Sequence, residues 1–445
     1  MFFVEHLNSL VWSPPLLGAF FLCGLYFSMK TDFFQLTGLR YWLSRTLCSL
    51  FRKKNRQTDG ETSVFGAVCT ALGASIGTGN IVGVATAITM GGPGSVFWLL
   101  FSSLFSMMLI YTENFLGAKY RYKNEKNQRI NGAYAYMEKG LNARWMGLLY
   151  AFFMVFSSLS MGNMAQSNSI ASALNASFSV PTLATGLILA VLIGFTILGG
   201  RKRIAKLSSA LVPFVGILYL LGGLIVIVYH RHSLGSALSL IWHDAFRLRP
   251  IAGGITGFGM MRAMRYGVAR GVFTHEAGIG TSLPLLDTGD GSSPEQQGLW
   301  GIFQVFIDTF VICTVTALVI LMSGVYVPGN SLTGAPLSSA AFQTVFGGGG
   351  GYFISIPIVL FAFATLTSCS LLGLKGLEYM LGPGSRKLYI PVYLLCIVLG
   401  CINPVEAVFS LADIFNGLMA MLNLTALFLL RKQVHSPLSK GGRRP

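Results

Sequence analysis

The strongest constraint on the fold of this chain is its series of long apolar runs, such as PPLLGAFFLCGLYFSM, TLATGLILAVLIGFTILGG and IPIVLFAFATLTSCSLLGL. A helix rises about 1.5 Å per residue, so each run is close to the length that crosses a hydrocarbon core of about 30 Å. Charged residues make up only 11% of the 445 residues, whereas soluble domains carry about 25%. The sequence therefore predicts an all-α polytopic membrane protein.

We expect eleven membrane-spanning helices. The first apolar run begins well inside the chain, and no small-residue cleavage site follows it, which favours a retained helix over a signal peptide. The expected spans are 14–30, 64–90, 94–118, 146–176, 182–199, 208–229, 264–285, 298–324, 352–380, 388–402 and 405–431.

The basic residues predict the orientation of these spans. The net charge is +16, and 26 of the 32 Lys and Arg residues fall in the segments 30–56, 119–145, 201–206, 375–387 and 431–445. All five segments share one side of the membrane if the N-terminus is outside and the C-terminus inside, as the positive-inside rule requires. This distribution indicates a membrane orientation signal rather than a nucleic-acid-binding surface.

One expected span, 64–90, is interrupted by the stretch GASIGTGNIVG at 73–83. Each glycine inside a helix costs about 1 kcal/mol relative to alanine. Close helix packing through Gly79 and Gly83 explains one or two of these glycines, but it does not explain the consecutive Gly77-Thr78-Gly79-Asn80. We therefore expect a broken helix at 75–80. Non-helical backbone at this depth survives only where protein or a water-filled cavity lines it.

A second interruption, in ARGVFTHEAGIGTSLPLL, predicts a broken helix at 271–281, five spans after the first. Two broken helices at corresponding positions indicate two inverted five-helix repeats with a binding site at the bilayer midplane. The expected domains are an N-terminal helix with a basic loop (1–63), the first repeat (64–230), an extracytoplasmic loop (231–262), the second repeat (263–431) and a basic tail (432–445).

An enzyme is the remote alternative. GASIG matches the G-x-S-x-G nucleophile elbow of hydrolases, with Ser75 as the nucleophile. That motif needs a preceding strand and a His–acid pair, and neither is apparent around this apolar segment. The seven cysteines are scattered singly, so no metal cluster or disulfide framework is predicted.

Several motifs together resemble the alanine/glycine:cation symporter family: GTGNIVGVATAITMGGPGSVFW, MGNMAQSNSI, ILGGRKRIAKLSSALVPF, GVARGVFTHEAGIGT and FIDTFVICTVTALVIL. The resemblance runs from about Phe65 to Leu430. It implies a fold of the leucine-transporter (LeuT) type, with two inverted five-helix repeats and an added N-terminal helix. It also implies sodium-coupled uptake of alanine or glycine across a bacterial cytoplasmic (inner) membrane, with lipids as neighbours and no organic cofactor.

The resemblance and the broken helix together suggest a site. Exposed amides at the start of a helix favour a carboxylate, and freed carbonyls suit a sodium ion. The expected substrate-binding residues are Thr78, Gly79, Asn80, Gln166, Phe273, His275, Thr365 and Cys369, and the expected sodium ligands are Ser75, Gly77, Thr365 and Ser368. The structural alternatives are i−4 back-bonds for the hydroxyls, including that of Thr367, and interhelical contact for Gln166.

Five ionisable residues within the expected spans are further candidates, with structural ion pairs as the alternative for all but Glu276: Glu113, Arg270, Glu276, Asp308 and Asp413.

Two residues depart from the family pattern. His275 replaces an asparagine in SNEAG, and Cys369 replaces a tryptophan of the ninth span. Loss of an indole would make room for a larger amino acid. A titrating His275 would allow proton coupling instead of sodium coupling. Both remain alternatives to alanine/glycine symport with sodium, and the sequence predicts no oligomeric state.

Overall fold

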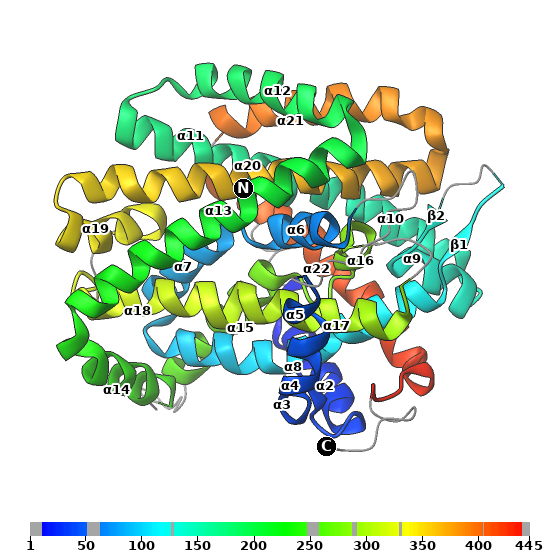
Figure 1. Cartoon of the computed structure of the whole chain (residues 1–445), viewed down its shortest axis with the longest axis horizontal. Helices are drawn as coiled ribbons and strands as arrows, with labels where there is room; N and C mark the ends of the chain where they lie inside the picture. The colour runs from blue at the N-terminus through cyan, green and yellow to red at the C-terminus, as the bar shows by residue number, and fades with distance from the viewer. Residues whose placement is uncertain are drawn as a thin grey trace.

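The structure is a computed structural model that describes residues 11–50, 63–125, 129–246, 258–286, 292–328, 332–403 and 405–437. Within these ranges the chain is almost entirely helical (Figure 1). The basic residues 52–56, those after 437, and the acidic residues Asp287 and Asp290 lie outside the described residues, as do parts of the expected loop 231–262.

The helices follow the expected spans in order. The longer elements are α2 (Pro14–Lys30), α6 (Val64–Ser75), α7 (Val84–Gly91), α8 (Gly94–Lys119), α10 (Arg144–Leu159), α11 (Ala165–Phe178), α12 (Thr182–Leu198), α13 (Gly200–Tyr229), α14 (Leu234–Ala245), α15 (Phe258–His275), α17 (Pro294–Val305), α18 (Thr314–Met322), α19 (Gly334–Phe346), α20 (Gly349–Leu381), α21 (Arg386–Ile402) and α22 (Val405–Leu429).

Short elements connect them. They are α3 (Phe34–Thr37), α4 (Leu39–Arg45), α5 (Leu47–Leu50), α9 (Ala133–Ala135), α16 (Ser282–Leu286), the π-helical turns η1 (Gly79–Gly83), η2 (Tyr136–Gly140), η3 (Ser160–Met164) and η5 (Phe306–Cys313), and the 3-10 turns η4 (Arg231–Ser233), η6 (Pro383–Ser385) and η7 (Arg431–Gln433). Strands β1 (Tyr122–Lys123) and β2 (Arg129–Ile130) form a two-stranded antiparallel sheet in which Tyr122 pairs with Ile130.

The described helices include seven that are long and apolar enough to cross a membrane. The pair Val64–Ser75 and Gly79–Gly91, bent by 42°, gives an eighth if it counts as one span. Helices α2 and α12 follow expected spans but hold only 17 residues each, and α15 carries several arginines. By length and composition, seven or eight spans are identified among the described residues, and the expected count of eleven is not confirmed.

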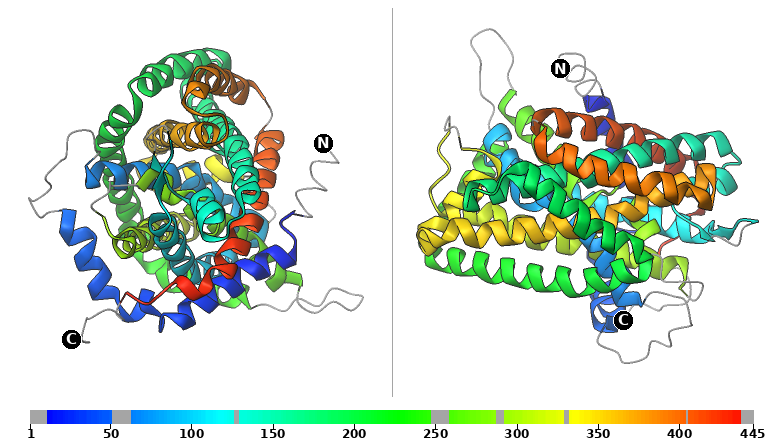
Figure 2. Two further views of the ribbon diagram at one scale, coloured as in Figure 1. Left: turned by 90° about the vertical axis from the view of Figure 1, so that its right-hand side faces the viewer. Right: turned by 90° about the horizontal axis from the view of Figure 1, so that it is seen from above.

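Helix α6 packs against α13, α16 and α20, and α15 packs against α7, α8 and η1 (Figure 1). Helix α8 packs along α15 and α17, α20 packs against α6, α10, α11 and α13, and α12 packs against α21. The two views of Figure 2 place the N-terminal helices α2 to α5 on the outside of this bundle. Helix α2 packs on α8 and α22.

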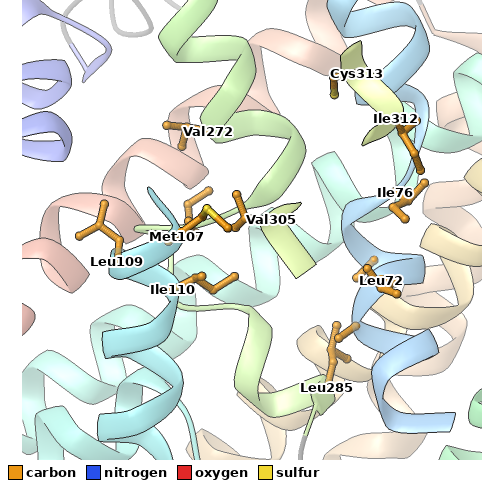
Figure 3. Packing of buried hydrophobic residues seen from close by; sticks show 14 of the residues in the cluster. Leu72, Ile76, Met107, Leu109, Ile110, Val272, Leu285, Val305, Ile312 and Cys313 are labelled. Carbon is orange, nitrogen blue, oxygen red and sulfur yellow. The ribbon is translucent and has the colours of Figure 1, made fainter. Parts of the chain in front are cut away.

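Apolar side chains fill the space between the central helices. Figure 3 shows part of this core, where Leu72 and Ile76 of the α6 region lie near Ile312 of η5, and Met107 of α8 lies near Val305 of α17. The core includes residues of both α6 and α15, among them Leu72 and Val272.

Candidate functional site

The first interruption separates α6, which ends at Ser75, from η1, which begins at Gly79. The side chain of Asn80 holds this segment. Its Oδ1 accepts a hydrogen bond from the N–H of Gly77 at 3.0 Å, and its Nδ2 donates to the carbonyl of Asp308 at 3.0 Å and to its carboxylate at 2.8 Å. Asn80 thus joins the broken helix to η5, 228 residues further along the chain.

Gln166 of α11 reaches the same segment from another side. Its Oε1 accepts from the Thr78 hydroxyl at 3.1 Å and lies 3.5 Å from the Thr78 amide nitrogen, while its Nε2 donates to the carbonyl of Met161 at 3.3 Å. Gln166 therefore contacts the interruption itself, beyond what simple interhelical contact requires.

Thr365 of α20 faces the end of α6. Its hydroxyl lies within hydrogen-bonding distance of the carbonyl oxygens of Gly73 (2.9 Å), Ile76 (3.5 Å) and Phe361 (3.1 Å). Ser368 lies about one turn after Thr365 on the same helix. Its buried Oγ has no hydrogen-bond partner among the described residues, and it lies 3.2 Å from the position that a Cβ on Gly73 would take. Two hydroxyls and two helix-end carbonyls thus converge as a set of neutral oxygen ligands.

The other expected sodium ligands are placed differently. The Ser75 hydroxyl donates back to the carbonyl of Leu72 at 3.3 Å, and the Thr367 hydroxyl donates to that of Ala364 at 2.8 Å. Gly77 contributes by lacking a side chain, because a Cβ there would lie 2.7 Å from the Thr365 hydroxyl and 3.3 Å from Gln166 Oε1. Among the backbone oxygens, those of Gly73 and Ile76 stand beside Thr365.

Gly79 faces the second helix pair rather than open space. A Cβ at Gly79 would lie 2.9 Å from Thr274 Cγ2 and 3.2 Å from the Phe273 ring. The two interrupted helices therefore touch at this point. Phe273 in turn forms a small apolar cluster with Met161 and Ala412.

The second interruption begins later than the expected 271–281, because α15 continues as a helix to His275 and α16 resumes at Ser282. Glu276 has a φ of 54°, and Gly278 and Gly280 have φ of 88° and 91°. These left-handed conformations end the helix, and glycine adopts them without steric cost. The Tyr150 hydroxyl donates to the Ile279 carbonyl at 2.8 Å and holds the segment in place.

Buried polar groups also support this second segment. Asn423 Nδ2 donates to the Glu113 carboxylate at 2.6 Å and to the Gly278 carbonyl at 2.9 Å, and the Tyr136 hydroxyl donates to Asn423 Oδ1. Arg270 and Asp413 approach within 4.0 Å as an ion pair, and the Arg270 guanidinium lies 5.4 Å from the centre of the Phe273 ring.

His275 and Cys369, the two departures from the family pattern, are both buried. His275 Nδ1 accepts from the N–H of Ala277 at 3.0 Å, and its Nε2 has no partner among the described residues. Cys369 packs on Gly162, because a Cβ on that glycine would collide with the Cys369 side chain. The structure thus brings Thr78 and Gln166 into direct contact, joins Asn80 to Gly77 and Asp308, and places Cys369 one helical turn beyond Thr365.

Comparison with known proteins now decides the family. A family model described as the sodium:alanine symporter family matches residues 1–440. The chain belongs to the sodium:alanine symporter family. It is therefore an integral membrane transporter and not an enzyme, which overturns the Ser75 hydrolase alternative.

Relatives and solved structures agree with this membership. The chain is 35% identical to the sodium/alanine symporter AgcS of Methanococcus maripaludis, over 96% of this chain and 94% of AgcS. It is 36% identical to the probable sodium/glutamine symporter GlnT of Bacillus subtilis, over 99% and 93%. The fold resembles that of MhsT in complex with L-phenylalanine, with a TM-score of 0.58 and 15% identity over 82% of this chain and 89% of that chain. This symporter therefore has LeuT-type architecture.

Some features of the site were not predicted. The carbonyls of Gly73 and Ile76 carry no sequence signal, because every residue has one. Asn80 and Asp308 each stand out in the sequence as polar residues in apolar spans. Nothing in the sequence indicates, however, that they form a hydrogen bond with each other.

Proposed function

We propose that this symporter couples the uptake of a small neutral amino acid, of the alanine/glycine class, to sodium by alternating access. The observation that carries the proposal is the convergence of Thr365, Ser368 and Gln166 on the interrupted helix α6–η1. The family name and the AgcS relative support the substrate class and the coupling ion.

The amino-acid carboxylate would bind at Thr78, where the helix resumes. The start of a helix carries about half a positive charge, which favours an anion. The Thr78 amide and hydroxyl face Gln166 Oε1, and the amide contact is long at 3.5 Å. A carboxylate is a stronger acceptor than a neutral amide oxygen, so it would replace Gln166 as the acceptor for Thr78.

Sodium would bind between Thr365, Ser368 and the carbonyls of Gly73 and Ile76. The residues fit this ion because all four ligands are neutral oxygens, which hard cations prefer. The unpaired buried hydroxyl of Ser368 supports the assignment, because a buried polar group without a partner is costly. The ion would tie α20 to the end of α6 and supply positive charge near the substrate carboxylate.

The architecture proposed for this cycle is two inverted five-helix repeats, 64–230 and 263–431, with α2 outside them. The broken helices α6–η1 and α15–α16 occupy corresponding positions in the two repeats, as transporters of this kind require. The Arg270–Asp413 ion pair and the cluster of Phe273, Met161 and Ala412 would close one side of the substrate site. With the N-terminus outside and the C-terminus inside, that side faces outward.

A larger substrate is the second candidate, and the GlnT relative favours it. Loss of the family tryptophan at Cys369 motivated this idea. In the structure the space beside Cys369 is about 10 Å³, room for about one water molecule, so it does not discriminate between the two substrate classes. The alanine/glycine class rests on the family and on the AgcS relative.

Counterflow and uptake of labelled alanine in proteoliposomes would test the proposal. We expect uptake that requires an inward sodium gradient and that is inhibited by glycine more strongly than by glutamine or leucine. Uptake driven equally well by a proton gradient without sodium would refute sodium coupling. Stronger inhibition by glutamine than by glycine would refute the substrate class.

A further inference from the structure

A small enclosed cavity lies beside the second interruption, about 10 Å³ in volume. Neither Thr365 nor Ser368 lines it, although Cys369 of its wall directly follows Ser368 on α20. Polar residues from four segments line it, namely Ser157 and Ser158 of α10, Glu276 and Thr281 of the interruption, Cys369 of α20 and Asn416 of α22.

Glu276 is the ionisable carboxylate of this lining, and only one of its two carboxylate oxygens accepts a hydrogen bond from a described residue. One carboxylate oxygen accepts from the Thr281 hydroxyl at 2.5 Å. No described residue donates a hydrogen bond to the other oxygen, and no ion pair among the described residues includes Glu276. A buried carboxylate is stable as an anion only when a cation or several donors accompany it.

The neighbouring groups provide oxygens rather than positive charge. Ser157 donates to Asn416 Oδ1 at 2.5 Å, and both residues line the cavity. Ser158 is already held by the Cys369 carbonyl at 2.7 Å and by the Tyr389 hydroxyl at 2.8 Å. The Thr281 hydroxyl keeps its lone pairs available while it donates to Glu276. A carboxylate with hydroxyl and amide oxygens is the ligand set that a hard cation prefers.

We propose that this cavity is a second cation site, built on Glu276, for a small monovalent cation. The cavity admits one group of about the size of a water molecule. Two sources supply such a group, a second sodium ion or the α-ammonium of the amino-acid substrate. The inference rests on the proposed symport function and adds a charged partner that the Thr365–Ser368 site does not have.

Direct binding measurements would test it. Wild type, Glu276→Gln, Thr281→Val and the control Glu113→Gln are purified in detergent and titrated with radioactive sodium and labelled alanine. Glu113 is also a buried carboxylate with one oxygen that lacks a partner among the described residues, and Asn423 donates to its other oxygen, but it lies outside the cavity wall. If a second sodium ion occupies the cavity, Glu276→Gln should lose one bound sodium ion and keep the other. An ammonium source predicts an unchanged number of sodium ions and alanine affinity reduced by about tenfold or more.

Thr281→Val keeps the Glu276 carboxylate and removes the Thr281 hydroxyl oxygen. It should therefore weaken by several-fold whichever affinity Glu276→Gln reduces, that for the second sodium ion or that for alanine. Glu276→Asp, which keeps a carboxylate, should restore part of that affinity. The inference is overturned if Glu276→Gln and Thr281→Val both bind sodium and alanine as wild type does. That result would leave sodium-coupled symport intact. Absence of sodium binding by the wild type would instead refute the proposed function.

Discussion

Replacing Gly77 with alanine tests the proposed sodium site with a single methyl group. The new Cβ would lie 2.7 Å from the Thr365 hydroxyl and 3.3 Å from Gln166 Oε1. To relieve a contact this short, Thr365 would have to move away from the carbonyls of α6. Overpacking a buried position in this way costs about 1–3 kcal/mol. If the sodium-bound state carries this cost, sodium affinity should fall by about 5- to 150-fold.

Gly83→Ala provides the matched control in the same broken helix, because a Cβ there meets nothing within 4 Å. Gly83 lies within η1 and Gly77 lies in the interruption, so any gain in helix propensity applies to Gly83→Ala alone and does not account for a loss of sodium affinity in Gly77→Ala. The assay is the sodium dependence of alanine uptake in proteoliposomes, together with the thermal stabilisation that sodium gives the purified protein. Equal sodium affinities in Gly77→Ala, Gly83→Ala and wild type would refute the placement of sodium beside Thr365.

Three further predictions concern neighbouring positions. Thr365→Val should weaken sodium-induced thermal stabilisation far more than Thr367→Val, whose hydroxyl only bonds the preceding turn; equal effects would argue against a sodium ligand at Thr365. Cys369→Trp should lower the melting temperature and abolish uptake, because an indole overfills a space of about 10 Å³ against Gly162; a stable, active variant with narrower specificity would show that the pocket opens there. His275→Asn should leave the pH profile of sodium-driven uptake unchanged, whereas uptake that follows a proton gradient and loses its pH dependence in this variant would establish proton coupling.

The sequence predicted the helix interruptions because their composition conflicts with their surroundings. The run Gly77-Thr78-Gly79-Asn80 within an apolar span is unfavourable in a continuous helix, and the structure ends α6 at Ser75. Gly271 shows the limit of this argument. It lies inside α15, where a Cβ would stand 3.4 Å from Ser102 Oγ and 3.6 Å from the Leu99 carbonyl. That glycine permits close approach of α8 rather than a break, and composition alone does not separate the two uses.

The partners within the site were less predictable, for a physical reason. Gln166 and Thr365 stood out as polar residues in apolar spans, but contacts such as that of Asn80 with Asp308 depend on how distant helices pack. Whether the Cys369 position enlarges the pocket likewise depends on a neighbour from a distant segment, Gly162, against which the cysteine packs. The sequence does not indicate which neighbours occupy the volume that a smaller side chain leaves.

The π-helical turn η3 carries a consequence for how this span could be altered. A π turn accommodates an extra residue by bonding i to i+5, and η3 lies between α10 and α11. Removing one residue from Ser160–Met164 would therefore restore α-helical bonding and leave the face of α11 where it is, whereas removing one residue from the α-helical part of α10 would rotate α11 by about 100°. Only the second deletion would turn Gln166 away from Thr78. The π turn therefore gives this span a place where its length can change by one residue while the same face of α11 meets the first interruption.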